Sequence, residues 1–282
     1  MLVRLAPRLM SFNAAGLSAE FMVISDKHKY VFVELPRTGS SAISRELREH
    51  YDGRNILHKH ATYDEFLSSA TDRESSYFVF GGLRNPVDDA VSLYFKLVTD
   101  HQRKFSRLQH AGWFTRLAYR FRSRQFHFAR ADKNGFSRFF LKFYRFPYDN
   151  WSSLAHARFD RVLRFETLVE DFDAALAQLG IEPVRPLPVG NKTGGRSMAY
   201  WEYYNTKAIA RARWVFGVYM EKWGYGFPIS WKLGEAVPGA VNRLVFRFLN
   251  VFRRFYWRRL RPVVYAKIQR DQQRRRALEF VE

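Results

Sequence analysis

Short apolar runs alternate with helix-compatible segments over most of the chain. Runs rich in β-branched and aromatic residues predict buried strands at Tyr30–Leu35, Tyr77–Leu83 and Phe159–Phe165. A weaker run predicts a short strand at Asn55–His58. Strands that alternate with helices are typical of an α/β fold with a central parallel sheet, in which ligands bind beyond the carboxyl ends of the strands.

Helices are expected between and after these strands. Pro86 is a good first-turn residue, and Gly180 is a good helix terminator. The region 96–150 interrupts the alternation of strands and helices with segments rich in Arg and aromatic residues. The expected helices are Ser40–Tyr51, Tyr63–Ala70, one starting at Pro86, two around Trp113–Arg124 and Gly135–Tyr144, Leu168–Leu179, and a stretch over 199–222.

The last fifty residues have a different pattern, that of a basic amphipathic helix after a hinge at Pro238-Gly239. Polar residues at spacings of three and four share one helical face, and large apolar residues fill the other. We therefore expect a lead at 1–23, a domain at 24–228 with 96–150 inserted, and a helical basic extension at 229–282. The polar face consists of Arg243, Arg247, Asn250, Arg254, Arg258 and Arg261, and the apolar face includes Val241, Val245, Phe248, Phe252 and Phe255.

Two of the predicted strands run into turns that carry anion-binding groups. The first strand is followed by Pro36-Arg37-Thr38-Gly39-Ser40-Ser41, and the strand ending at Leu83 by Arg84-Asn85-Pro86 and a helix carrying Ser92. Backbone N–H groups and the helix dipole favour phosphate at such positions. Two sites of this kind, each with an arginine, predict a ligand with two separated phosphates.

These residues resemble the sulfotransferases that use 3′-phosphoadenosine 5′-phosphosulfate (PAPS), in particular the carbohydrate-type and related bacterial members. The resemblance covers about residues 24–228 in family order. It implies a P-loop-like three-layer αβα core, PAPS as co-substrate, and no requirement for a metal ion. Further similar segments are Arg164-Phe165-Glu166-Thr167-Leu168, Asn191-Lys192-Thr193 and Trp223-Gly224-Tyr225.

The resemblance also implies roles for the residues of both turns. Arg37 is implied to stabilise charge on the leaving oxygen, at a position where most members have lysine and tyrosylprotein sulfotransferases have arginine. Arginine keeps the charge but cannot donate a proton. Arg84 and Ser92 are implied to hold the 3′-phosphate. The 5′-phosphate is implied to contact Thr38, Gly39, Ser40, Ser41 and Ala42, while Lys192, Thr193 and Arg196 belong to a loop that covers the nucleotide.

A histidine after the short strand is a candidate general base for the acceptor hydroxyl. The tract His58-Lys59-His60-Ala61-Thr62 resembles the His-Ala-Thr segment of carbohydrate-type and bacterial relatives, so His60 is the first candidate and His58 the second. Glu34 is a third candidate. Each of these residues also has a structural interpretation. The histidines can be ordinary surface residues, Glu34 can pair with Arg37, and Arg84 can pair with Asp88 or Asp89. Glu166 is expected to orient neighbouring loops.

The net charge of +20 is concentrated in two segments. Residues 96–145 hold 13 Lys and Arg against 2 Asp and Glu, and residues 232–282 hold 13 against 4, so the remainder is balanced. Basic segments attract anionic polymers or membranes, although a solvated basic face is an equal alternative. We expect 240–262 to lie on an anionic membrane, with its Arg face on lipid phosphates and its aromatic residues, including Trp257, in the interface. The alternative is that the aromatic side of this helix packs on the domain or on a second copy of the chain.

Several other classes of chemistry are excluded by the sequence. The chain has no cysteine, which excludes disulfides, thiolate metal sites and a cysteine nucleophile. It has no Walker A, His-Glu-x-x-His, EF-hand or Gly-x-Ser-x-Gly motif. It also has no run of 18 apolar residues and no apolar signal core in its first 20 residues, so a cytoplasmic, peripheral location is expected.

The predicted function is transfer of a sulfuryl group from PAPS to an acceptor hydroxyl, on a carbohydrate or glycolipid, by in-line displacement with a histidine base. A nucleotide or small-molecule kinase on a related core is one alternative, and the absent Walker lysine argues against it. A basic nucleic-acid-binding protein is another, because aromatic and Arg-rich segments bind single strands. No nucleic-acid module is recognisable, so no nucleic-acid partner is expected.

Overall fold

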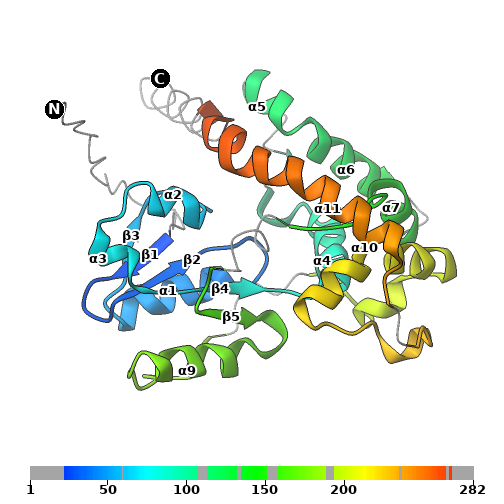
Figure 1. Cartoon of the computed structure of the whole chain (residues 1–282). Helices are drawn as coiled ribbons and strands as arrows, with labels where there is room; N and C mark the ends of the chain where they lie inside the picture. Colours follow the sequence, from blue (N-terminus) through cyan, green and yellow to red (C-terminus); the bar gives the residue numbers. More distant parts are fainter. Residues whose placement is uncertain are drawn as a thin grey trace.

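The computed structural model describes residues 22–58, 60–103, 105–106, 113–131, 135–150, 158–188, 194–234, 237–264 and 267–268. Within them, five strands form one mixed sheet in the order β3-β1-β2-β4-β5 (Figure 1). The strands are β1 (Met22–Ser25), β2 (Tyr30–Val33), β3 (Arg54–Ile56), β4 (Phe78–Leu83) and β5 (Arg161–Arg164).

The parallel half of the sheet is the part that was predicted. β2 pairs parallel with β4, with Val33 opposite Gly81, and β4 pairs parallel with β5, with Leu83 opposite Arg164. The three strands therefore end at the same edge of the sheet. The turns that follow β2 and β4 are brought next to each other there, as expected for the carboxyl ends of neighbouring parallel strands.

The other half corrects two expectations, because Tyr30–Leu35 is not the first strand and the sheet is not wholly parallel. β1 precedes β2, begins inside the expected lead, and pairs antiparallel with both β2 and β3. A turn of only four residues, 26–29, joins β1 to β2, and a connection this short permits only antiparallel pairing. Lys29 adopts a φ of 54°, and the His28 N–H donates to Ser25 Oγ at 3.1 Å.

Helices cover both faces of the sheet because alternate strand residues are apolar on both sides. Tyr30 and Phe32 point toward α1 (Ser40–His50) and α9 (Leu168–Gln178), whereas Val31 and Val33 pack with α2 (Tyr63–Leu67) and the segment around Tyr77. α2 begins with a capping box in which Thr62 and Glu65 bond reciprocally. The short helix α3 (Asp72–Ser75) precedes β4.

A second, mainly helical core lies beyond the carboxyl end of β4. It is built around α4 (Pro86–Val98), whose apolar residues pack with α6 (Arg120–Ala131), α7 (Phe136–Phe143) and α10 (Thr206–Trp223). This core contains many of the aromatic residues of the inserted region and of the stretch before α10. The remaining short elements are η1 (His101–Arg103), α5 (Trp113–Ala118), η3 (Phe165–Thr167), η4 (Tyr200–Tyr203) and η5 (Ile229–Trp231).

The extension forms one long helix that crosses the molecule from the helical core toward the sheet (Figure 1). It consists of α11 (Ala240–Phe255), the π-helical turn η6 (Tyr256–Leu260) and a further helical stretch over 261–264. The wider π turn comes just before Pro262, whose ring and missing N–H disturb the preceding α-helical turn. In the described part of the chain, no helix is long and apolar enough to cross a membrane.

The orientation of α11 contradicts the expectation of an aromatic side packed on the domain, because the aromatic side faces outward. Its polar side faces the protein, where Asn242, Phe246 and Asn250 are buried, and its large apolar residues face outward. Arg258 and Arg261, expected on lipid phosphates, instead contact Asp64 and Glu65. The helix is held by polar contacts because the surface beneath it offers carboxylates and backbone carbonyls.

One of these polar contacts buries a carboxylate. Asn250 Nδ2 donates to Asp149 Oδ2 at 2.9 Å, and Asp149 lies in the segment after α7. Burial raises the pKa of Asp149 to about 6, against the opposing effect of Lys222, Asn250 and Arg253. Because the folded pKa lies above the ordinary value of 3.8, protonation of Asp149 favours the folded state.

We therefore expect the free energy of unfolding to depend on Asp149 between pH 4 and pH 6. The stabilisation that protonated Asp149 gives the folded state is fully present below the pKa of the unfolded chain. It is lost as the pH rises through the pKa of the folded protein. Relative to Asp149→Asn, the wild type should lose roughly 1–3 kcal/mol across this window and nothing further above pH 7. Urea denaturation at several pH values measures this difference. The control is Glu182→Gln, which removes one carboxylate from an exposed loop; parallel pH curves for wild type and Asp149→Asn would contradict the expectation.

Candidate functional site

The turn after β2 is held in shape by its own backbone and hydroxyl groups. Arg37 and Gly39 adopt φ values of 68° and 76°, in the left-handed region. Thr38 Oγ1 and Ser40 Oγ both donate to the Leu35 carbonyl, at 2.9 and 2.6 Å. These two hydroxyls, expected to contact phosphate, thus shape the turn in this structure.

Ser41 and Ala42 lie in the first turn of α1, directly after this loop. The N-cap of α1 is Gly39, which contributes no side-chain hydrogen bond to the helix. The Ala42 N–H donates to the Gly39 carbonyl at 3.0 Å, so it is already used within the turn. The positive end of the α1 dipole still favours an anion at this position.

Close packing and a positive φ both favour a glycine at position 39. A Cβ atom at Gly39 would overlap Leu168 Cδ2 at the start of α9, in addition to the unfavourable φ. On β4, a Cβ atom at Gly82 would lie 2.5 Å from Thr38 Oγ1. The turn is thus packed directly against its neighbours from both β4 and α9.

The second turn is organised around Arg84, which is 7% exposed. Its Nε donates to Asp88 Oδ2 at 2.7 Å, and its Nη1 donates to the Arg37 carbonyl at 3.0 Å and reaches Ser92 Oγ at 3.5 Å. The guanidinium also lies 3.9 Å above the ring of Phe165. Arg84 therefore meets its expected hydroxyl partner Ser92, and it also forms the ion pair with Asp88 that was the structural alternative.

Two adjacent carboxylates on α4 connect the arginines of this site. Asp88 binds Arg196 as well as Arg84, and Asp89 binds Arg37 with a closest N–O distance of 2.7 Å. The Arg37–Glu34 pair considered from the sequence is replaced by Arg37–Asp89. Lys192 and Thr193 lie outside the described residues, so of the three residues expected to cover a nucleotide the structure describes Arg196.

Arg122 is a residue that the sequence did not single out. It lies on α6, where its Nη1 donates to Gln125 Oε1 at 2.9 Å. Burial and the like charge of Arg37 lower the pKa of Arg122 to about 10. Arg122 is thus close enough to Arg37 to add to the positive potential, but in the sequence it is one of several similar arginines in a basic segment.

The two candidate histidines have different surroundings. His60 Nδ1 lies 3.2 Å from the Glu34 carbonyl, just before the first turn, and His60 adopts a φ of 57°. A carbonyl can only accept a hydrogen bond, so Nδ1 is the donor in this contact. His58 Nε2 instead faces the Glu65 carboxylate at 3.0 Å. His60 therefore lies beside the first turn, whereas His58 is paired with Glu65 on α2.

Glu166 orients neighbouring segments, as expected. Its Oε1 accepts from the Asn85 N–H at 2.7 Å, and its Oε2 accepts from the Tyr225 hydroxyl at 3.0 Å. Burial, together with the charge of Glu166, raises the pKa of Tyr225. The end of β5, the start of α4 and the Trp223-Gly224-Tyr225 segment are thereby tied together.

Comparisons of the chain with protein-family models, with curated proteins and with solved structures found no match. The geometry of the two turns and the residues around them is therefore the basis for a functional proposal.

The packing around the first turn predicts the effect of Gly39→Ala. Gly180 is the matched control because it has a φ of 69° and open space around its Cβ position. Gly180→Ala should cost about 1–2 kcal/mol from the left-handed conformation alone. Gly39→Ala should cost about 1–3 kcal/mol more, because the overlap with Leu168 is added. Urea denaturation measures both losses, and equal losses would show that the turn is not tightly packed.

Proposed function

We propose that this protein is a PAPS-dependent sulfotransferase. The observation that carries the proposal is the position of Arg84, which contacts the Arg37 carbonyl of the first turn and the Ser92 hydroxyl of α4. The two turns are thus in direct contact at the carboxyl ends of β2 and β4, which supports one continuous anion-binding site. A ligand with two separated phosphate groups fits such a site, and PAPS carries a 3′-phosphate and a 5′-phosphosulfate.

Three arginines and two carboxylates surround the proposed site. Asp88 and Asp89 occupy the guanidinium groups of Arg84, Arg196 and Arg37 in this structure. Phosphate oxygens form charge-assisted hydrogen bonds of the same kind, so they compete with these carboxylates for the same donors. We propose that Arg84 and Ser92 take the 3′-phosphate, and that the first turn and Arg37 take the 5′-phosphosulfate.

The proposed core is P-loop-like, with three layers. Helices on both faces of the sheet and a turn from a parallel strand directly into α1 support it. A cytoplasmic location belongs to the same proposal and rests on the sequence alone.

The proposed reaction is an in-line displacement at sulfur. The acceptor oxygen forms a bond to sulfur, and the bond from sulfur to the bridging oxygen of the 5′-phosphate breaks. Arg37 stabilises the charge that develops on the leaving phosphate, as positioned cations do in phosphoryl transfer. The proposed acceptor of the hydroxyl proton is the imidazole of His60. The products are a sulfate ester and adenosine 3′,5′-bisphosphate, and the acceptor is a hydroxyl of a carbohydrate or glycolipid.

Nucleotide titration tests the assignment of the 3′-phosphate. We expect adenosine 3′,5′-bisphosphate to bind at least tenfold more tightly than AMP, because each charged contact contributes roughly 1.5–3 kcal/mol. Arg84→Ala should abolish this preference, and Ser92→Ala should reduce it without removing the guanidinium. Arg161→Ala is the control, since Arg161 begins β5 at the opposite edge of the sheet and pairs with Asp171.

Calorimetry at fixed salt measures these affinities, and circular dichroism checks that each variant is folded. Equal affinity of the intact protein for the two nucleotides would rule out the 3′-phosphate site. Tighter binding of ATP with magnesium than of adenosine 3′,5′-bisphosphate would favour the kinase alternative.

The assignment of the base predicts a difference between two asparagine variants. Asparagine tolerates the positive φ of His60 but has no basic nitrogen. His60→Asn should reduce sulfur-35 transfer from labelled PAPS to an extract of glycolipids and oligosaccharides by roughly 10²–10⁴-fold. Its affinity for adenosine 3′,5′-bisphosphate should stay nearly constant. His58→Asn is the matched control and should retain transfer activity. If His58→Asn loses transfer and His60→Asn retains it, the base is His58. If both variants retain transfer, Glu34 becomes the candidate base.

A further inference from the structure

The outward side of α11 is a continuous apolar surface. Most of its members recur at spacings of three and four, so they form one stripe along the helix and past the π turn. Each is at least 47% exposed, and most are close to two-thirds exposed. This outer face consists of Val241, Leu244, Phe248, Val251, Phe252, Phe255, Leu260 and Val263.

The outward orientation is imposed by the opposite side of the helix. Asn242 Nδ2 donates to the Trp214 carbonyl at 2.7 Å, Asn250 binds Asp149, and Arg261 Nη2 donates to the His60 carbonyl at 2.7 Å. Phe246 is buried between these polar anchors. Turning the helix to bury the outer face would break all of these contacts, so the apolar stripe remains directed away from the protein.

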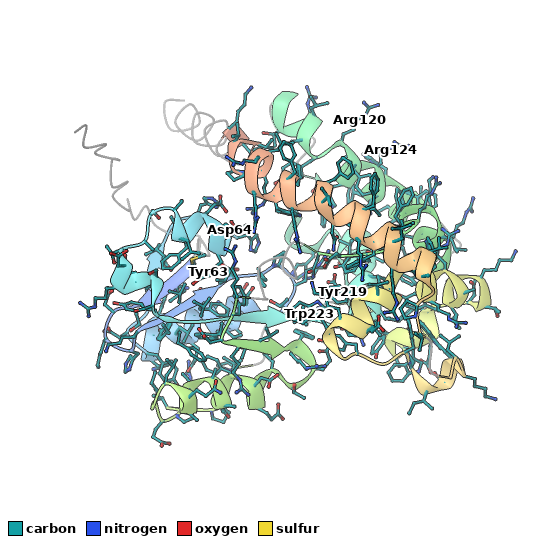
Figure 2. All side chains as sticks on the ribbon, in the orientation of Figure 1. Tyr63, Asp64, Arg120, Arg124, Tyr219 and Trp223 are labelled. Carbon is teal, nitrogen blue, oxygen red and sulfur yellow. The ribbon has the colours of Figure 1, made fainter. Side chains whose placement is uncertain are left out.

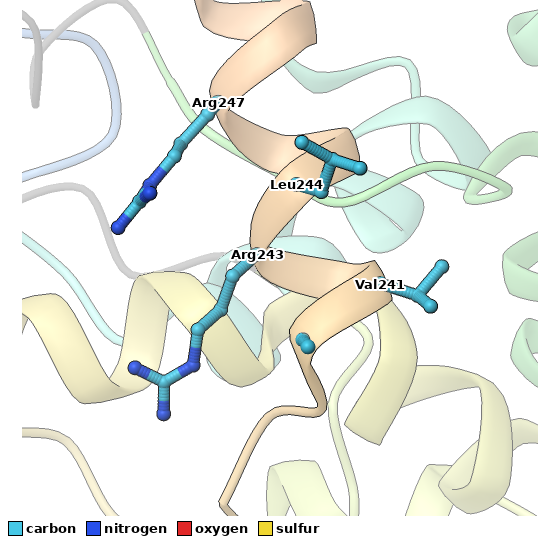
Figure 3. A pocket seen from close by; sticks show the side chains of 5 residues that line it. Val241, Arg243, Leu244 and Arg247 are labelled. Atoms are coloured by element: carbon cyan, nitrogen blue, oxygen red, sulfur yellow. The ribbon is translucent and has the colours of Figure 1, made fainter.

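Positive charge runs along the border of the outer face. Arg247 and Arg254 are exposed and lie seven residues apart, which places them on one line along the helix. At the start of α11, Arg243 and Arg247 extend to one side and Val241 and Leu244 to the other, around a shallow hollow (Figure 3). Residues 237–270 contain no Asp or Glu. The helix is therefore apolar at the centre of this surface and cationic at its edge.

The neighbouring helices add to this surface. Leu117 on α5 and Phe121 on α6 are both more than half exposed. Arg120 and Arg124 are exposed and extend from the same margin of the molecule as α11 (Figure 2). Burial raises the pKa of Tyr119, between α5 and α6, while the charges of Arg122 and Arg261 lower it in part. The end of the long helix and the α5–α6 corner are thus close to each other.

We propose that the outer face of α11 binds the surface of an anionic lipid bilayer. Interfacial helices place their apolar side chains at the boundary of headgroups and acyl chains, and their Lys and Arg side chains among lipid phosphates. The outer face of α11 and its arginine border have this arrangement.

A second copy of the chain is a poorer occupant. Two-fold pairing of α11 would place the arginine borders against each other with no carboxylate on the helix to neutralise them. An anionic membrane supplies both the apolar environment and the negative charge. The surface proposed here is separate from the two nucleotide-binding turns, so it does not depend on the proposed reaction.

Vesicle sedimentation with the full chain tests the proposal. Vesicles of phosphatidylcholine with one quarter phosphatidylglycerol should bind the protein at least tenfold more strongly than phosphatidylcholine alone, and 0.5 M NaCl should weaken the binding. The double variant Phe248→Ser/Phe252→Ser should lose at least tenfold in binding with an unchanged melting temperature, because both side chains are exposed. Ile229→Ser is the matched control, since Ile229 is 96% exposed but lies on η5. Arg247→Gln/Arg254→Gln should lower binding to anionic vesicles and its dependence on salt.

Three results would overturn the proposal. The first is that the wild-type protein does not sediment with anionic vesicles. The second is that the Phe248→Ser/Phe252→Ser variant binds these vesicles as the wild type does. The third is that the wild type is a dimer in ultracentrifugation without vesicles and that this variant is a monomer. The last result would assign the outer face to a second copy. Nucleotide affinity, measured on the same preparations, reports separately on the proposed enzyme.

Discussion

The buried guanidinium of Arg84 is the interaction on which the arrangement of the site depends. A buried charge is costly unless it is paired and hydrogen-bonded, and Arg84 meets this requirement through Asp88, the Arg37 carbonyl and the face of Phe165. These partners belong to α4, to the turn after β2 and to the end of β5. One side chain therefore connects the segments that follow the three parallel strands. The planar fork of arginine can make these contacts together, whereas the single ammonium of lysine cannot.

The parallel half of the fold and the meeting of the two turns were predictable because they depend on local patterns. Apolar runs mark β2 and β4, and two neighbouring parallel strands necessarily end at one edge. β1 was missed because four apolar residues after an unpatterned lead give little signal. The turn between β1 and β2 also lacks the Asn-Gly or Asp-Gly pair that marks many hairpins. The proximity of Arg122 to Arg37 was not predictable, since it depends on how α6 packs against α4.

The orientation of α11 shows what an amphipathic pattern can and cannot predict. Spacing identifies two faces of a helix, but the face that packs inward is decided by the surface beneath it. Here that surface offers the Trp214 carbonyl and the Asp149 carboxylate, which lie far from α11 in the sequence. Polar groups on the helix satisfy these acceptors, so the usual inward packing of the apolar side is reversed.

The bond from Arg261 to the His60 carbonyl joins residues 201 positions apart in the chain. During synthesis on a ribosome, the sheet and the loop that carries His60 emerge long before the helix that holds this loop from outside. Domains begin to fold from the amino-terminal side as they emerge. The His60 loop therefore gains this contact only after residue 261 has been made, so a nascent chain can form the core of the sheet before the contact exists.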